Sequence, residues 1–600
     1  MSRRGLALLL PLLAAAGCAG PPTPTPTPTP AAPEAATGWT DKPLVAAARQ
    51  MVAAAHPLAA EAGRQVLREG GSAVDAAVAV QMVLNVVEPQ SSGIGGGGFL
   101  MLWDGREVQA WDGREAAPAA ADERLFLRAD GTPVPFGEAV FGGRAVGTPG
   151  IVRMLEAVHR AHGVLPWARL FEPAITLAEQ GVPVGERLHR QLAGDALLRR
   201  DVRARALFYR ADGTPHPVGH RLRNPALAAV LRAVARQGSA ALHEGPIAQA
   251  IVADVQGHAV PGRLSLQDLA DYRALRRAPL CSDWAPHWRV CGFPPPSSGH
   301  LALMQMLGIV DALPGVPAGA AALQDGVPGP DWLHAYTEAA RLAYADRARY
   351  VADPAFVAAP GGDWQRLLDP AYLARRAALV GPRSLGQAAP GDPAGSGTAA
   401  ADMPAQPEAG TSHLSIVDAA GRAVAMTTTI EAQFGARLLS DGGTGLPGGF
   451  LLNNQLTDFA LAPADAQGRR VANRIEPGKR PRSSMSPTLV FDRRDDALVM
   501  SLGSPGGAAI PHFVARQLFG TLRWGLDAQQ AAALPGFGSF NGPTVLERGR
   551  FPAATLQALQ ARGHAVQEVE LTSGVHAVQR TPRGWAGAAD PRREGAVRGD

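Results

Sequence analysis

The residues of this chain best suited to chemistry follow a junction in its second half. The run Gly410-Thr411-Ser412-His413 comes after a Pro-, Gly- and Ala-rich stretch and opens a segment whose alternation is typical of a strand. A Thr hydroxyl is a weak nucleophile unless a base lies beside it, and a free α-amine on the same residue can be that base. Two alternatives follow: an ordinary loop-to-strand junction, or a cleavage site that makes Thr411 a new N-terminus.

A second Thr is expected beside the first. Residues 412–418 and 423–429 read as two strands joined by a short turn. If Asp418 pairs with Ala423, then Ser412 lies opposite Thr429, and Thr429 is a close neighbour of Thr411 across the pair. The sequence thus predicts a hairpin that holds two Thr side chains together.

Three polar segments further along suit a small zwitterionic ligand. Asn453–Phe459 carries amides and a carboxylate, Lys479–Pro487 carries two adjacent hydroxyls, and Gly503–Gly507 places two Gly at a strand-to-helix turn. Backbone N–H groups at such a turn can point toward a developing oxyanion. Taken singly, each segment has an ordinary alternative, namely a turn, a helix cap or close packing.

Composition bounds the fold and excludes one class of partner. A chain of 600 residues exceeds one ordinary core, which indicates two large lobes or one large layered domain. The net charge of +4 is small and no basic run occurs, so nothing indicates a nucleic-acid partner. Helical patterns dominate residues 150–276, while short strands alternate with helices after Thr411, which predicts a layered α+β sandwich.

The N-terminus reads as an export signal. Residues 1–17 contain an apolar run that is too short to span a membrane. Ala15-Ala16-Gly17-Cys18 resembles a bacterial lipobox, in which Cys18 would be lipidated, and the Pro-Thr-rich linker over residues 18–40 would space the protein from a membrane. We therefore expect a periplasmic protein anchored to the outer membrane by lipid; a plain secretory signal is the alternative.

The two remaining cysteines flank a predicted hairpin. An oxidising compartment permits a disulfide between Cys281 and Cys291, and two buried free thiols are the alternative. With only these two Cys and no clustered His in the sequence, we expect no metal site.

The order of several motifs resembles the γ-glutamyltranspeptidase family. The resemblance covers residues from about 44 to 595 and rests on Thr411-Ser412-His413, Leu452-Asn453-Asn454-Gln455, Arg480–Pro487 and Gly503–Gly507, together with the upstream runs Gly93–Phe99, Arg114–Pro118, Pro294–Gly299 and Ala345-Asp346-Arg347 and the late run Gly587–Arg592.

The resemblance implies a fold and a maturation route. It implies a four-layer αββα sandwich of the N-terminal-nucleophile hydrolase type, made as one inactive chain. Self-cleavage between Gly410 and Thr411 would give a large subunit, residues 41–410, and a small catalytic subunit, residues 411–600, that stay together. Thr411 would then attack the γ-amide of glutathione or a related γ-glutamyl donor and pass the acyl group to water, an amino acid or a peptide.

The resemblance also implies roles for single residues, with no cofactor and no metal. The attacking group would be supported by Thr429, and the oxyanion hole would be formed by Gly506 and Gly507. The substrate α-carboxylate would be held by Arg114, Ser483 and Ser484, and its α-amine by Glu431, Gln455 and Asp458. A guanidinium fork suits a carboxylate, and carboxylates suit an ammonium group.

Two other functions remain open. The same machinery could cleave another amide, such as a glutaryl-cephalosporin side chain or poly-γ-glutamate, although Arg114 and Asp458 together favour an amino-acid-like acyl group. The chain could also be a surface lipoprotein that only binds. A nucleotide site at Gly95–Gly98 is excluded, because no Gly-Lys-Ser/Thr follows the glycines.

Overall fold

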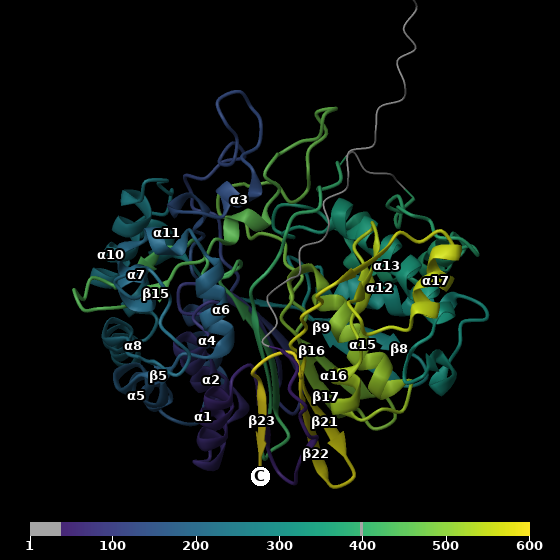
Figure 1. Ribbon diagram of the computed structural model, residues 1–600, viewed down its shortest axis with the longest axis horizontal. Coiled ribbons are helices and arrows are strands. Elements are labelled where there is room, and N and C mark those ends of the chain that lie inside the picture. The colour runs from purple at the N-terminus through teal and green to yellow at the C-terminus, as the bar shows by residue number, and fades with distance from the viewer. Residues whose placement is uncertain (1–37, 396–399) are drawn as a thin grey trace, which may run out of the picture. The chain divides into compact units, whose positions relative to one another are not determined.

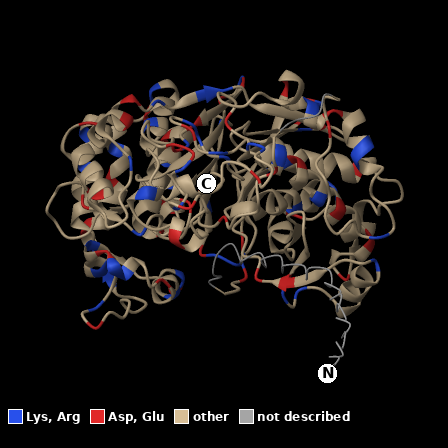
Figure 2. Ribbon diagram, turned by 90° about the horizontal axis from the view of Figure 1, so that it is seen from above, with Lys and Arg blue, Asp and Glu red and all other residues tan. Residues whose placement is uncertain are grey.

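The computed structural model describes residues 38–395 and 400–600. The signal segment, Cys18 and nearly all of the Pro-Thr-rich linker lie outside the described residues. Within the described ranges, no helix is both long and apolar enough to cross a membrane. Positive and negative residues are interspersed over the helices and loops (Figure 2).

Two seven-stranded antiparallel sheets form the centre of the fold. The first runs in the order β1 (Val45–Ala47), β22 (Gly584–Ala589), β21 (His576–Thr581), β17 (Ala497–Gly503), β16 (Thr488–Asp492), β9 (Trp288–Gly292) and β8 (Leu280–Trp284). The second runs in the order β23 (Ala596–Gly599), β2 (Met51–Ala54), β12 (Ser412–Val417), β13 (Ala423–Thr429), β3 (Gly97–Trp103), β4 (Val108–Asp112) and β7 (Leu275–Arg277). Each sheet therefore mixes strands from before and after Thr411.

Alternation along the strands decides which side chains face which layer. In β2, Met51 and Ala53 join the core between the sheets, whereas Val52 and Ala54 join the core beneath the first helical layer. This is the period of two that a pleated strand imposes. Between the sheets, the rings of Phe99 and Phe293 stack with centroids 4.0 Å apart.

Helices cover the outer face of each sheet (Figure 1). The second sheet is covered by α1 (Pro57–Arg68), α2 (Ala73–Val87), α4 (Ile151–His162), α5 (Glu172–Gln180) and α8 (Pro225–Gln237). The first sheet is covered by α12 (Gly299–Ala312), α13 (Pro330–Tyr350), α15 (Ile510–Leu522) and α16 (Ala528–Ala533). The predicted four-layer αββα sandwich is confirmed.

Smaller elements complete the outer layers. They include α6 (Glu186–Gly194), α7 (Val202–Phe208), α10 (Gly245–Gly257), α11 (Leu266–Asp271), α14 (Pro370–Ala377), α17 (Ala553–Ala561) and a three-stranded sheet of β18 (Phe537–Ser539), β19 (Thr544–Glu547) and β20 (Val566–Val569).

Local sequence signals set where the central helices start. Before α2, Ser72 Oγ accepts from the Asp75 N–H at 3.1 Å while an Asp75 carboxylate oxygen accepts from the Ser72 N–H at 2.7 Å. The run Ser72-Ala73-Val74-Asp75 predicts this capping box from the sequence alone, and the structure forms it. Every residue of α2 is buried, because its small Ala and Val side chains let the helix lie close to the sheet.

The predicted hairpin around the cysteines is formed by β8 and β9. Cys281 pairs with Cys291 across the ladder, and the two residues are joined by a disulfide with their Cα atoms 4.0 Å apart. The disulfide ties together the two strands at one edge of the first sheet.

Candidate active site

Two Thr hydroxyls converge on one carbonyl group at the central junction. Thr411 lies directly before β12, is buried, and donates from Oγ1 to the Gly410 carbonyl oxygen. Thr429 Oγ1 donates to the same oxygen at 3.0 Å, and the Glu431 N–H donates to Thr429 Oγ1 at 2.8 Å. The carbonyl of the peptide bond before Thr411 is thus held between two buried hydroxyls.

The pairing of the two central strands differs from the prediction by one residue. Val417, not Asp418, pairs with Ala423, and Ser412 pairs with Thr428 rather than Thr429. The reason is that the Asp418 carboxylate is used in the turn, where it accepts from the Ala420 and Arg422 N–H groups at 2.9 and 3.0 Å. Extended by one pair, the observed register sets Thr411 directly opposite Thr429.

The backbone at the junction tolerates only glycine. Gly410 has a φ of +75°, and a Cβ built on it would lie 2.1 Å from the carbonyl oxygen of Glu431. Glu431 itself has a φ of +74°, which is rare for a residue with a side chain. Strained backbone on both sides of a reacting group is typical of functional sites.

The glycine turn after β17 lies across the cavity from the two Thr residues. Gly506 and Gly507 have φ values of +134° and +53°, and the turn leads into α15. A Cβ on Gly507 would lie 2.0 Å from the Glu408 carbonyl oxygen, and one on Gly506 would lie 2.5 Å from the Phe513 ring. The turn brings backbone and the positive end of the α15 dipole to the reacting centre.

One cavity collects the predicted catalytic and substrate-binding residues. Of these, Gly506 alone is not in its lining, and the lining set is Arg114, Thr411, Thr429, Glu431, Gln455, Asp458, Ser483, Ser484 and Gly507. Residues 408–410 of the uncut chain also line the cavity. The structure therefore brings together segments that are more than 300 residues apart in sequence.

Arg114 contacts one of the residues expected to hold the substrate α-amine. Its buried guanidinium pairs with Asp458 and donates to the carbonyl oxygens of Pro481 and Arg482 at 3.2 and 2.9 Å. Ser483 Oγ accepts from the Met485 N–H at 3.1 Å, so it caps its own turn. The guanidinium group expected to hold the substrate α-carboxylate and the carboxylate expected to hold its α-amine are thus in contact in the uncut chain.

Two carboxyl groups of the cavity, Glu431 and Asp458, have pKa values above their usual range. Burial, reinforced by the charge of Asp458, raises the pKa of Glu431 well above its usual value. Burial also raises the pKa of Asp458 to about 6, although Arg114 acts in the opposite direction. Gln455 Nε2 donates to Asp458 at 2.7 Å, but Gln455 Oε1 has no partner among the described residues. An ammonium group would satisfy all three side chains.

Three charged residues of the site were missed by the sequence analysis. Glu408 is held by Arg347, and Arg482 lies close enough to act on the charge of both. Arg347 and Arg482 lie inside motifs that carried the family resemblance, so their positions were marked but not their roles. For Glu408, an acidic residue shortly before the expected cut was the available signal.

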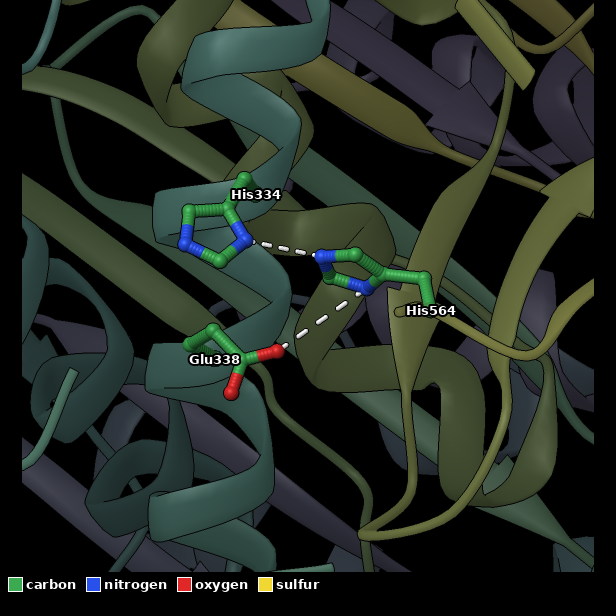
Figure 3. Close-up of side chains that lie close together, drawn as sticks. All are labelled: His334, Glu338 and His564. Carbon is green, nitrogen blue, oxygen red and sulfur yellow. Dashed lines mark hydrogen bonds and ion pairs between the residues drawn. The ribbon is translucent and has the colours of Figure 1, made fainter. Parts of the chain in front are cut away.

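A second buried polar cluster lies away from the cavity. We name it the histidine clasp; its members are His334, Glu338, Arg341, Thr544 and His564. Figure 3 shows the imidazole rings of His334 and His564 facing one another, with Glu338 close by. The clasp joins α13 to the sheet of β18, β19 and β20, so it connects the chain before the junction with the chain after it.

Hydrogen bonds run through the clasp in one direction. Arg341 can only donate, and it donates to Thr544 Oγ1 at 2.8 Å; Thr544 in turn bonds His564 Nδ1 at 2.7 Å. His564 Nε2 then donates to His334 Nδ1 at 2.7 Å, and His334 Nε2 donates to the Gly381 carbonyl oxygen at 2.8 Å. Burial lowers the pKa of His564 to about 3, so the ring is neutral.

Two histidines and a glutamate within 4.8 Å also form a candidate metal group. In each ring one nitrogen already donates a hydrogen bond and the other already accepts one, and Glu338 accepts from Arg341, Ser384 and the Leu385 N–H at 2.6, 2.9 and 2.8 Å. The arrangement is therefore that of a hydrogen-bonded tie rather than a set of ligands aimed at one point.

The sandwich and the Thr at the start of a central strand define a fold of the N-terminal-nucleophile hydrolase type. The sequence profile described as Gamma-glutamyltranspeptidase matches residues 59–599. The chain is 34% identical over 562 residues to the glutathione hydrolase proenzyme of Bacillus subtilis (strain 168), which covers 92% of this chain and 91% of the relative. The chain belongs to the γ-glutamyltranspeptidase family, which confirms the resemblance.

Relatives named as acylases are similar to this chain, as well as relatives named as glutathione hydrolases or γ-glutamyltranspeptidases. It is 33% identical over 573 residues to the Acylase ACY 1 proenzyme of Pseudomonas sp. (strain V22), with 94% of this chain and 96% of the relative covered. The cephalosporin acylase from Bacillus halodurans superposes with a TM-score of 0.80 at 26% identity, over 97% of this chain and 99% of that one. The γ-glutamyltranspeptidase of Helicobacter pylori gives a TM-score of 0.51 at 31% identity, over 57% of this chain and 93% of that one.

Proposed function

We propose that this chain is a self-cleaving proenzyme whose mature form transfers the γ-glutamyl group of glutathione or a related donor to water, an amino acid or a peptide. The observation that carries the proposal is the Gly410 carbonyl held between the hydroxyls of Thr411 and Thr429. This carbonyl lies in a cavity whose wall offers carboxylates for an ammonium group, and hydroxyls and one guanidinium group for a carboxylate. Such a wall matches the two charged groups of a γ-glutamyl donor.

Cleavage would proceed as an acyl shift within the chain. Thr411 Oγ1 attacks the Gly410 carbonyl carbon, and Thr429 donates to the oxygen on which negative charge develops. The C–N bond then breaks, the nitrogen takes up the proton that Oγ1 has lost and becomes the new α-amine, and Gly410 remains as an ester on Thr411. Water hydrolyses the ester, which frees the Thr411 hydroxyl and leaves the base beside it.

Turnover would repeat this chemistry on a donor. The α-amine titrates near about 8, so a part of it is neutral and can take the proton from Thr411 Oγ1. Oγ1 attacks the γ-carbonyl, and backbone N–H groups of Gly506 and Gly507 receive the oxyanion. The amine of the leaving group departs with a proton, and water or an acceptor amine resolves the γ-glutamyl ester.

The test of self-cleavage combines a denaturing gel with N-terminal sequencing. The wild-type protein should run as two fragments, the smaller beginning Thr-Ser-His-Leu, whereas Thr411→Ala should stay one inactive chain. Thr521→Ala, a Thr outside the cavity, is the matched control and should cleave normally. A small fragment with any other start contradicts the proposal.

Related acylases make a second candidate function, an amide acylase acting on glutaryl side chains. The full-length superposition on a cephalosporin acylase supports it. A glutaryl group has no ammonium for Glu431, Gln455 and Asp458. We expect kcat/KM on γ-glutamyl-anilide to exceed that on glutaryl-anilide by about 30-fold or more, because losing one partner of a buried charged contact costs about 2 kcal/mol or more. The reverse preference would make the chain an acylase.

We also propose that Cys18 is lipidated and anchors the enzyme in the periplasm at the outer membrane. The basis is the lipobox-like run before Cys18 and the Pro-Thr-rich linker after it. Cys18→Ser should release active enzyme from the membrane fraction or leave the signal uncleaved. A wild-type protein that already fractionates as soluble would make the signal a plain secretory one.

A further inference from the structure

A guanidinium group beside the cavity already holds a carboxylate in the uncut chain. Arg347, near the C-terminal end of α13, donates from Nη2 to Glu408 Oε1 and to Ser484 Oγ, both at 2.6 Å. Its Nε donates to Ser298 Oγ at 2.8 Å, which fixes the plane of the guanidinium group. The Arg347 side chain is only 9% exposed, so it is a fixed, buried cation directly behind Glu408.

The other contacts of Glu408 complete a site built for an anion. Glu408 Oε2 accepts from Ser484 Oγ at 2.7 Å. Burial alone would raise the pKa of Glu408, but Arg347 and Arg482 hold that pKa below its usual value. Glu408 is therefore an ionised carboxylate bound by one hydroxyl and one guanidinium group, with a second guanidinium group nearby.

This carboxylate lies in the same cavity as the carbonyl group of the bond before Thr411. In the uncut chain, the Gly410 carbonyl occupies the place of the reacting carbonyl, and Glu408 lies two residues before it. Its carboxylate reaches Ser484, a residue that the proposed function assigns to the donor carboxylate.

Arg114, the other cation assigned to that carboxylate, is engaged elsewhere. Its guanidinium group contacts Asp458 and two backbone carbonyl oxygens. Of these two guanidinium groups, Arg347 is the one that shares a bound carboxylate with Ser484.

We propose that Arg347 determines specificity for the α-carboxylate of the donor, and that Glu408 occupies this subsite in the uncut chain. The inference rests on the proposed function and deepens it. Cleavage makes residues 408–410 the end of a chain, so Glu408 can leave Arg347 and Ser484 to the donor. Until then, the carboxylate subsite is closed by the protein itself.

The first experiment compares two donors that differ only in this carboxylate. Purified, cleaved Arg347→Gln should lose about 30-fold or more in kcat/KM on γ-glutamyl-anilide. On 4-aminobutyryl-anilide, which keeps the ammonium and the amide but lacks the carboxylate, it should match the wild-type protein within about 3-fold. Arg349→Gln, two residues further along α13 and paired with Asp402, is the matched control and should alter neither substrate. A merely structural role for Arg347 would lower both activities alike, and that result overturns the inference.

The second experiment uses the chain's own anion. The peptide Gln-Pro-Glu-Ala-Gly, the sequence of residues 406–410, should bind the mature protein in calorimetry and compete with γ-glutamyl-anilide. Gln-Pro-Gln-Ala-Gly should bind at least about 10-fold more weakly, and Arg347→Gln should remove the difference. Equal binding of the two peptides to the wild-type protein overturns the inference.

The two experiments separate this inference from the proposed function. If the mature protein cleaves no γ-glutamyl-anilide, the proposed function fails, while calorimetry with the two peptides still decides the subsite. If it cleaves that anilide but the peptides bind equally, the function stands and the role of Arg347 falls. Should Arg347→Gln block cleavage of the chain, calorimetry of the two peptides with the wild-type protein still decides the inference, because equal binding overturns it.

Discussion

Two buried polar clusters share helix α13, and they are satisfied to different degrees. In the histidine clasp, the side-chain nitrogens of both His rings and both Glu338 carboxylate oxygens have partners, and the hydrogen bonds form one directed chain. In the cavity around Thr411, the carboxyl groups of Glu431 and Asp458 have raised pKa values, and Gln455 Oε1 has no partner among the described residues. The backbone there has positive φ values at Gly410 and Glu431. Both clusters are equally removed from water.

The difference separates a structural task from a chemical one. Burying a polar group costs free energy unless a hydrogen bond replaces the lost water, and the clasp makes that replacement in full. In the cavity some of these hydrogen bonds are not made, so a ligand that carries the complementary charges gains the free energy of making them. Between these two clusters, it is the incomplete hydrogen bonding of buried polar groups, rather than burial or charge, that distinguishes the cavity from the clasp.

The largest contrast is expected between two glycines, one from each region. Gly410→Ala should slow self-cleavage by roughly 1,000-fold, because a Cβ would meet the Glu431 carbonyl oxygen and force a positive φ on alanine. Gly381→Ala is the matched control: Gly381 accepts the end of the clasp chain, but no heavy atom lies within 4 Å of its built Cβ. Fragment formation over time on a denaturing gel measures both. A normally cleaving Gly410→Ala would refute the strained geometry.

Truncation within the clasp should affect stability and not turnover. In the uncleavable Thr411→Ala background, His564→Ala should lower the free energy of unfolding by about 3 kcal/mol, since the Thr544 hydroxyl and His334 Nδ1 each lose their bond to His564. Denaturant unfolding gives this value. In the cleaved enzyme the same substitution should leave kcat/KM within about 2-fold, and a larger loss would connect the clasp to the chemistry.

Asp458 should make the uncut protein less stable as the pH rises. Its pKa of about 6 in the fold lies above the usual value of 3.8 for an aspartate, so the fold binds the proton more tightly than the unfolded chain. That contribution is present below about pH 4 and is lost as the pH rises through about 6. Relative to Thr411→Ala/Asp458→Asn, the Thr411→Ala protein should lose about 2 kcal/mol between pH 4 and pH 7. A pH-independent difference would contradict the raised pKa.

The smallest effect is a gain of stability inside the site. In the Thr411→Ala background at pH 7.5, Glu431→Gln should raise the free energy of unfolding by about 1 kcal/mol, because it removes a carboxylate that burial disfavours. The cleaved variant should bind its donor more weakly, seen as a raised KM. Glu338→Gln in the clasp is the matched control and should destabilise, because Arg341 would lose its carboxylate partner.

Much of the fold followed from local patterns, and the rest depended on contacts that local patterns do not encode. Alternation predicted the central hairpin, and the Ser72 and Asp75 pair predicted the start of α2. The one-residue register error arose because Asp418 could serve either the ladder or the turn, and only the folded turn decides between them. The motifs predicted most of the residues that line the cavity, because the residue types at such a site must match a charged ligand.

The clasp and the contact between Glu408 and Arg347 could not be predicted from the sequence, and the reason is the same for both. His334 and His564 are 230 residues apart, and neither lies in a pattern that predicts a partner. Arg347 and Glu408 are 61 residues apart on opposite sides of the Pro- and Gly-rich stretch, where sequence offers no geometry. Pairings of this kind are set by the packing of whole layers, which a single sequence does not display.

The interleaving of strands changes what unfolding means for the cut protein. β2 lies between β23 and β12, so a strand from before the junction is hydrogen-bonded on both sides to strands from after it. Once the bond before Thr411 is broken, unfolding releases two molecules instead of one, and refolding becomes a second-order reaction that dilution slows. The intact chain can recover after denaturation by itself, whereas the mature protein depends on its partner's concentration. Its lifetime would therefore be set by the rate at which it first opens, and the proposed self-cleavage would exchange reversibility for activity.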